Sequence, residues 1–312
     1  MCNTRYDVRL PLVVLRISLF VTDNEEQKMK HIIVIVCFLI TSCTNNNKIG
    51  YAFEPIICNP EETPKYDEKR IPILDKYGNL IYDKVKGGVV IRDSLGKGII
   101  KKRSIFKPCR EMIYNAEFKT NENKLISKGK IKVMASGTRW KYQPEKQDEI
   151  IVQYEFTQSD YDSNLEHQLN KGLLANKWFG EVKEGVIENV EEVWMHPFRD
   201  NQYNFTEVAP FPEIRYPLEI GKTWSESIRI QGWGDWDNST IDSEYEIVNR
   251  DLVNTNYGIM ENCWHVHSKS NFELGETKFE YWFSEEFGFV KMDYKNYGNQ
   301  SLCIELSEIL EK

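Results

Sequence analysis

Apolar and polar residues alternate along the C-terminal part of the chain, and this period of two predicts β-strands. In one segment Phe279, Tyr281 and Phe283 alternate with Lys278 and Glu280. Six strands are predicted, at 223–230, 241–248, 258–270, 277–284, 289–295 and 301–309. Short connectors rich in Gly, Asn and Glu separate them, which predicts a meander of hairpins in which each strand pairs with the one before.

Further upstream, weaker alternation predicts strands at 130–134 and 150–156. One helix is predicted at 162–171, because Leu165, Leu169 and Leu173 recur every four residues and Gly172 would cap its end. The sequence therefore predicts a mainly β protein. Its core element is a large curved antiparallel sheet, or a half-barrel or sandwich, with few short helices.

The segment from Met29 to Cys43 (MKHIIVIVCFLITSC) combines a basic start, a short apolar core and two small residues before a cysteine. The core is too short to span a bilayer, which takes about 20 apolar residues, and has the length of a signal-peptide core. The residues 40–43 (ITSC) resemble the lipobox of bacterial lipoproteins. This resemblance implies that residues 29–42 are cleaved off and that Cys43 carries acyl chains, which anchor the protein to a membrane.

The rest of the chain divides into four segments by composition. We expect residues 1–28 to be an upstream extension, since a lipoprotein signal begins at its initiating Met and purine-rich codons for 25–28 would resemble a ribosome-binding site. Residues 43–70 are polar and broken by proline, which predicts a tether. An N-terminal β-rich segment is expected at 71–125 and an antiparallel β domain at 126–312. Thr44 after the lipidated cysteine favours the outer membrane, by resemblance to lipoprotein sorting in Gram-negative bacteria.

The net charge argues against nucleic-acid binding, and the cysteine content bears on which disulfides can form. A formal net charge of −8 excludes the basic footprint that nucleic-acid binding needs. Beyond the leader and Cys43, four cysteines remain. An exported protein permits two disulfides, with Cys58–Cys109 and Cys263–Cys303 as the pairing local in sequence. Buried reduced thiols are the alternative.

Two stretches carry a resemblance to a family. Residues 217–224 (PLEIGKTW) and 281–294 (YWFSEEFGFVKMDY) resemble uncharacterised periplasmic β proteins and lipoproteins of Gram-negative bacteria. Some of these are similar in sheet design to lipoprotein carriers of the Lol type, half-barrels around an apolar cavity. In such a carrier the concave face would be lined by residues such as Phe279, Tyr281, Val290 and Ile304. The resemblance implies a fold and no catalytic residues.

Two groups of residues are candidates for binding, and each also has a possible structural role. His196 and Arg199 lie in a stretch dense in functional residue types, WMHPFR, where a structural corner with Arg199 paired to a carboxylate is the favoured alternative. Trp233 and Trp236 could present indoles to a carbohydrate from a loop, or pack over the sheet.

A third group contains Cys263, His265 and His267, which are spaced to share one strand face. Because one strand rarely supplies more than two ligands, no metal site is expected.

No motif of a phosphate-binding loop, nucleophile elbow or metalloprotease is present in the sequence. We therefore expect a cell-envelope protein that the lipid on Cys43 anchors to the outer membrane. We expect no catalytic residues, no cofactor and no nucleic-acid partner. It would bind an apolar ligand or act as an envelope scaffold, and a carbohydrate-binding surface lipoprotein is the alternative.

Overall fold

The computed structural model describes residues 50–56, 105–144, 146–169, 178–189, 191–231 and 236–311 with their side chains. Four short strands are described by their backbone: β1 (Glu62–Pro64) pairs with β2 (Tyr82–Lys84), and β3 (Gly88–Arg92) with β4 (Gly98–Lys102). The extension 1–28, the signal segment 29–42 and the lipidation residue Cys43 lie outside the described residues.

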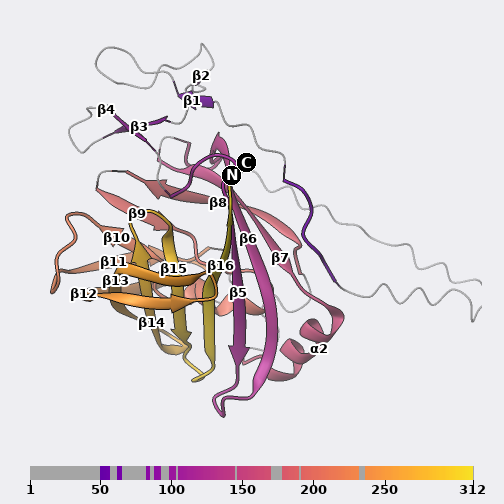
Figure 1. The fold of residues 1–312 in the computed structure, drawn as a ribbon. Helices are drawn as coiled ribbons and strands as arrows, with labels where there is room; N and C mark the ends of the chain where they lie inside the picture. Colours follow the sequence, from indigo (N-terminus) through magenta and orange to yellow (C-terminus); the bar gives the residue numbers. More distant parts are fainter. Residues whose placement is uncertain are drawn as a thin grey trace, which may run out of the picture. The chain divides into compact units, whose positions relative to one another are not determined.

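Twelve antiparallel strands form one sheet (Figure 1), in the order β10-β9-β8-β7-β6-β5-β16-β15-β14-β13-β12-β11. The mainly β fold with a curved antiparallel sheet is confirmed. The bounds of its strands are β5 (Glu111–Lys119), β6 (Leu125–Arg139), β7 (Asp148–Glu155), β8 (Glu181–Glu188), β9 (Glu192–Met195), β10 (Glu213–Arg215), β11 (Thr223–Arg229), β12 (Thr240–Thr255), β13 (Gly258–Phe272), β14 (Gly275–Ser284), β15 (Gly288–Lys295) and β16 (Ser301–Leu310).

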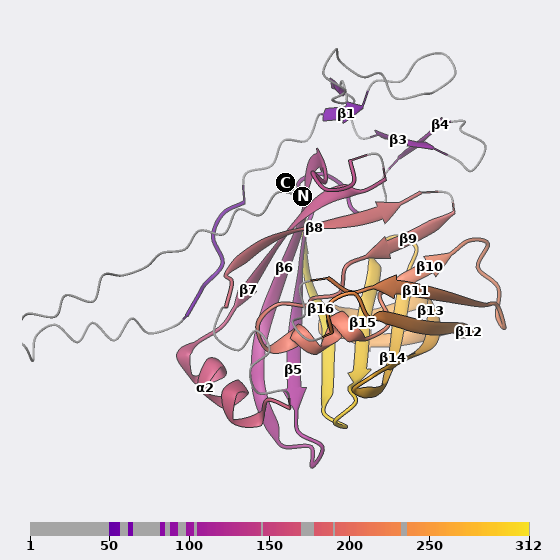
Figure 2. The same ribbon diagram turned by 180° about the vertical axis from the view of Figure 1, so that it is seen from behind.

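The connection between the two edge strands explains why the sheet curves. β10 and β11 lie at opposite ends of the strand order, yet only residues 216–222 separate them in sequence. A flat sheet would hold them about 53 Å apart, at roughly 4.8 Å per strand. The connector can reach no more than about 28 Å. The sheet therefore bends until its edges approach, and the two strands lie side by side in both views (Figures 1 and 2).

Side chains bridge the seam between these edges. Nε1 of Trp224 on β11 donates a hydrogen bond to Oε2 of Glu213 on β10, at 3.1 Å. Nζ of Lys222 donates to the carbonyl oxygen of Arg215 at 2.8 Å. The sheet is thus held in its curved form by side-chain contacts where the backbone ladder stops.

The concave face of the sheet is covered by the chain itself. Residues 196–212, which we call the inner segment, include the 3-10 helix η1 (Asn201–Val208). The ring of Phe205 lies 5.6 Å from that of Phe118 on β5 and 6.1 Å from that of Tyr294 on β15, between centroids. The inner segment therefore joins the two halves of the sheet into one apolar core.

The strands expected from alternation are confirmed in place and pairing. All six C-terminal strands are present, and each pairs with its neighbour in sequence. β12 and β13 extend further than predicted, to Thr255 and Phe272. The end of β12 was missed because its apolar alternation stops after Val248, where most residues are exposed or partly exposed. β5 falls in the expected segment 71–125 and pairs with both β6 and β16.

The helix is displaced from its predicted bounds. α2 spans Gln158–His167 and begins at the N-cap Thr157, whose hydroxyl accepts from the Asp160 amide at 3.3 Å. Oδ2 of Asp160 accepts from the Thr157 amide in return, at 2.8 Å. This capping box sets the start, while Leu165 and Leu169 are exposed and Gly172 lies outside the described residues. No helix in the described residues is long and apolar enough to span a bilayer.

Of the two alternatives for Cys263 and Cys303, the disulfide does not form, and both residues are free thiols. They lie on β13 and β16, with β14 and β15 between them. Three strand spacings are about 14 Å, twice the Cα separation of about 7 Å beyond which a disulfide does not form. Cys109 is disulfide-bonded, and its expected partner Cys58 lies outside the described residues.

Candidate functional site

Arg199 lies in the inner segment and binds two carboxylates from different elements. Its Nε and Nη2 donate to Glu184 on β8 at 3.0 and 2.9 Å. Its Nη1 donates to both carboxylate oxygens of Glu207 on η1, at 3.1 and 2.9 Å. The pairing of Arg199 with a carboxylate, expected from the sequence as a structural corner, is confirmed. The guanidinium fork therefore fastens the inner segment to the sheet.

Burial shifts the titration of this group of residues. Burial raises the pKa of Glu184 to about 7, although the Arg199 charge acts in the opposite direction. Burial also lowers the pKa of His196 to about 3, and the positive charge of Arg199 lowers it further. His196 is therefore neutral at pH 7. Its Nδ1 lies 3.2 Å from the Gly185 carbonyl oxygen and 3.3 Å from Oε2 of Glu184, so the neutral ring carries its proton on Nδ1.

Aromatic rings enclose the imidazole of His196. The ring centroids of Trp194, Trp140 and Phe211 lie 4.7, 5.2 and 6.0 Å from that of His196. Tyr154 extends the polar group on the other side by donating to Asp200 at 3.3 Å. The rings around His196 and the carboxylates around Arg199 hold both side chains in one position. Because both residues belong to the inner segment, these contacts fix its position against the sheet.

Only one of the two tryptophans that could present indoles to a carbohydrate or pack over the sheet lies in the described residues. Trp233 lies outside the described residues. Trp236 is partly buried and packs against an apolar cluster of Val208, Ile230 and Ile241. Its indole thus covers the sheet next to the end of η1, as the packing alternative predicted.

The lining expected of a carrier is occupied. Phe279, Tyr281, Val290 and Ile304 each have no exposed surface. The hydroxyl of Tyr281 donates to the Glu213 carbonyl oxygen, and that of Tyr245 bonds to the backbone of Phe211. The four residues named for the lining of a carrier are therefore packed in the core of the chain itself.

A carboxylate group at the seam was not foreseen from the sequence. Glu213 is buried and accepts hydrogen bonds from Trp224 and from Arg215. Burial raises the pKa of Glu226 to about 8, and the nearby charge of Glu213 adds to the effect. The only sequence signal was Glu226 within an alternating strand, and nothing local indicated that β10 and β11 would meet.

The expectation that Cys263 shares a face with His265 and His267 is wrong. Cys263 is fully buried in the core, and burial raises the pKa of its thiol to about 11. The pairing register of β12 and β13 shifts between Asp251 and Val253, where two residues of β13, at 261–262, stand opposite one residue of β12, directly before Cys263. Such irregularities bend a strand and break strict alternation, so the thiol turns inward while the two histidines face outward.

No family model matches this sequence, and no curated protein matches it. Among solved structures, a candidate exported protein with a YmcC-like fold from Bacteroides fragilis is 12% identical at a TM-score of 0.39, covering 65% of this chain and 96% of that one. A candidate lipoprotein from Parabacteroides distasonis is 10% identical at a TM-score of 0.36, and the match covers 67% of this chain and 100% of that one. The hypothetical lipoprotein YmcC from Escherichia coli is 10% identical at a TM-score of 0.28, and the match covers 68% of this chain and 90% of that one.

These three proteins are described as an exported protein and two lipoproteins. At these identities and scores the likeness supports no statement about activity or ligand. The fold of this chain rests instead on its own strand pairing.

Proposed function

We propose that this chain is a lipid-anchored protein of the bacterial outer membrane, whose curved sheet acts as an envelope scaffold. The anchor is the acylated Cys43, and the support for it is the lipobox-like sequence 40–43 after a short apolar core. The choice of a scaffold over a carrier of apolar ligands rests on one observation. The inner segment occupies the concave face where a carrier would hold its ligand.

Displacing the inner segment would be costly. An apolar ligand would have to replace Tyr203 and Phe205, which are both buried. Each large apolar side chain contributes roughly 1.5–3 kcal/mol when it leaves water. The ligand would also leave Arg199 without one of its carboxylates, because Glu207 belongs to η1. A filled core with a fastened inner segment favours a rigid structural role.

The anchor is tested by mass spectrometry of the protein extracted from its own membranes. We expect an N-terminus at Cys43 with the added mass of acyl chains, and no phospholipid retained under native conditions. The Cys43→Ser variant is the control and should leave the membrane fraction. An unacylated wild-type chain would refute the anchor.

The scaffold role is tested with N-phenyl-1-naphthylamine, a dye that fluoresces in apolar cavities. We expect no fluorescence gain with the wild-type protein. A gain is expected with Phe205→Ala, which opens space on the concave face and serves as the positive control. Saturable binding of the dye to wild-type protein, reversed by phospholipid, would show a carrier instead.

A further inference from the structure

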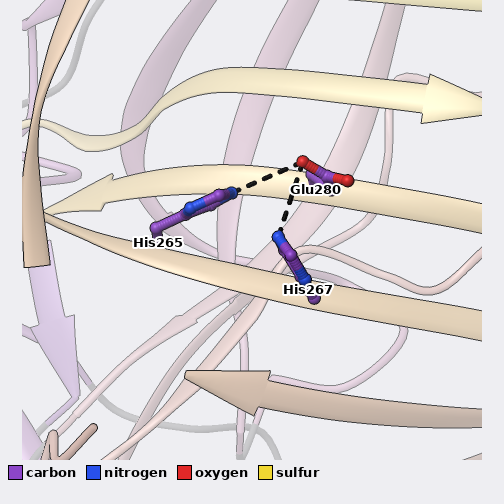
Figure 3. Close-up of side chains that lie close together, drawn as sticks. All are labelled: His265, His267 and Glu280. Carbon is purple, nitrogen blue, oxygen red and sulfur yellow. Dashed lines mark ion pairs between the residues drawn. The ribbon is translucent and has the colours of Figure 1, made fainter. Parts of the chain in front are cut away.

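Two histidines and a glutamate meet on the outer face of the sheet. His265 and His267 stand two residues apart on β13, and Glu280 on β14 is the direct pairing partner of His267. Figure 3 shows both imidazoles directed at the Glu280 carboxylate. The neighbouring strand thus supplies a third group that one strand alone could not.

The distances among these groups suit a small tetrahedral ion. Nε2 of His265 lies 3.5 Å from Oε2 of Glu280, and Nε2 of His267 lies 3.6 Å from the same oxygen. The three ligand atoms all lie within 4.8 Å of one another. Tetrahedral Zn²⁺ with bonds of about 2.0–2.1 Å separates its ligand atoms by about 3.3 Å. Small side-chain rotations would bring the three atoms to that separation, and His267 is half exposed.

His265 is oriented in advance. Its ring stacks on Trp282 with centroids 4.2 Å apart and planes at 10°. Nε2 of this ring is buried and lacks a hydrogen-bond partner among the described residues. Oε2 of Glu280 lies 3.5 Å from this nitrogen, farther than in an ordinary hydrogen bond, so a cation between them would satisfy both groups.

Nearby lysines do not compete for Glu280. Lys278 pairs with Glu276 at 3.5 Å, and Lys291 pairs with Glu305 at 2.8 Å. Within the described ion pairs, Glu280 contacts only the two histidines. Its carboxylate is therefore left to complete a ligand set of two imidazoles and one carboxylate.

We propose that His265, His267 and Glu280 bind one Zn²⁺ ion on the outer face of β13 and β14, with water in the fourth position. Two imidazoles and a carboxylate are a ligand set that zinc accepts, and three protein ligands leave one position open. This site is independent of the scaffold role, because it lies on the opposite face of the sheet from the inner segment.

The test is calorimetric titration of the purified, lipid-free chain from Cys43 with zinc chloride. We expect one site whose affinity falls more than about tenfold in His267→Ala and in Glu280→Gln, since each removes one ligand. Glu261→Gln is the control, because it removes the same charge from an exposed position of β13 and leaves both the ligands and the Lys278–Glu276 ion pair intact. Its affinity should equal that of the wild type. Equal zinc binding by wild type, His267→Ala and Glu280→Gln would overturn the proposal.

A second measurement locates the ion. Cu²⁺ quenches nearby indole fluorescence, and it binds imidazole sites more tightly than Zn²⁺ does. We expect Cu²⁺ quenching that excess Zn²⁺ reverses and that is largely lost in Trp282→Phe, because Trp282 stacks on His265. Quenching unchanged by Trp282→Phe and by His267→Ala would place the ion elsewhere and refute the site.

Discussion

At the scale of residues, Arg199 is the most connected charge in the described structure of the inner segment. Its three nitrogens contact Glu184 and Glu207, and Asp200 lies beside it. A buried charge group of this kind contributes little net stability compared with an apolar core, but removing one member is costly. We therefore assign Arg199 a positioning role: its ion pairs fix how the inner segment lies against β8.

We expect Arg199→Ala to lower the free energy of unfolding by about 3–5 kcal/mol, because Glu184 and Glu207 would remain buried without a cation. Urea unfolding followed by tryptophan fluorescence measures this. Arg250→Ala is the control, since Arg250 is exposed and lies over the Trp264 ring at 4.9 Å. A loss below about 1 kcal/mol in Arg199→Ala would contradict the positional role.

His196 should make the protein sensitive to acid. Its pKa falls from 6.5 to about 3 on folding, so the unfolded state takes up the proton first. The stability tied to neutral His196 is fully present above pH 6.5 and declines as the pH falls toward 3. Glu184 acts oppositely: its pKa rises from 4.5 to about 7, so its contribution is present below pH 4.5 and is lost as the pH rises through 7.

The comparison of wild type with His196→Gln separates the two effects. We expect the variant to lose less stability than the wild type between pH 6.5 and 4, by up to a few kcal/mol at about 1.4 kcal/mol per pH unit. Urea unfolding at a series of pH values measures it. Parallel curves for the two proteins would show that His196 does not stay neutral in the folded state.

At the scale of elements, the strands were predictable, whereas the bounds of the one predicted helix were not. In β12, β14 and β16 buried residues alternate with more exposed ones, so alternation in the sequence reports the sheet directly. The helix was sought from the spacing of Leu165 and Leu169, but both are exposed and the buried residue of α2 is Asn164. The usable signal was the Thr157–Asp160 capping box, which marks the start independently of packing.

The capping box gives a local prediction. We expect Thr157→Ala to destabilise α2 by about 1 kcal/mol, because the Asp160 amide loses its acceptor. Faster hydrogen exchange of amides in α2, with little change in the strands, would show it. Ser159→Ala, an exposed change inside the helix, is the control and should leave exchange unchanged or slower. Equal exchange in both variants would mean that tertiary contacts alone fix the helix.

The candidate sites differ in how far the sequence could reveal them. Glu280 was within reach: the hairpin between β13 and β14 turns at Glu273 and Leu274, and counting back from that turn pairs Glu280 with His267. The partners of Arg199 were not, because Glu184 lies 15 residues away across a strand pair. No local pattern records which carboxylate a curved sheet will bring to a buried arginine.

At the scale of the whole molecule, the order of strands makes the last one central. β16 lies in the middle of the sheet, where it pairs with β5 and β15. It thereby joins two meanders, β5 to β10 and β11 to β16, in each of which every strand pairs with its neighbour in sequence. The pair β5–β16 links residues almost two hundred positions apart, such as Met112 and Ile309. Contacts so distant in sequence form late, because the closure of a long loop costs entropy before any contact is gained.

Removal of β16 should therefore unfold more than one strand. We expect a chain ending at Gln300 to lose cooperative unfolding and protease resistance, because β5 and β15 would become open edges and Leu302, Ile304 and Leu306 would leave the core. A chain ending at Leu310 is the control: it loses the ion pair of Arg110 with the exposed Glu311, while Arg110 keeps its bond to the Glu286 carbonyl. Limited proteolysis and urea unfolding compare the two. If the chain ending at Gln300 still unfolded in one transition, the two meanders would be stable without their central pair, and the curved sheet would be two units joined at β5 and β16.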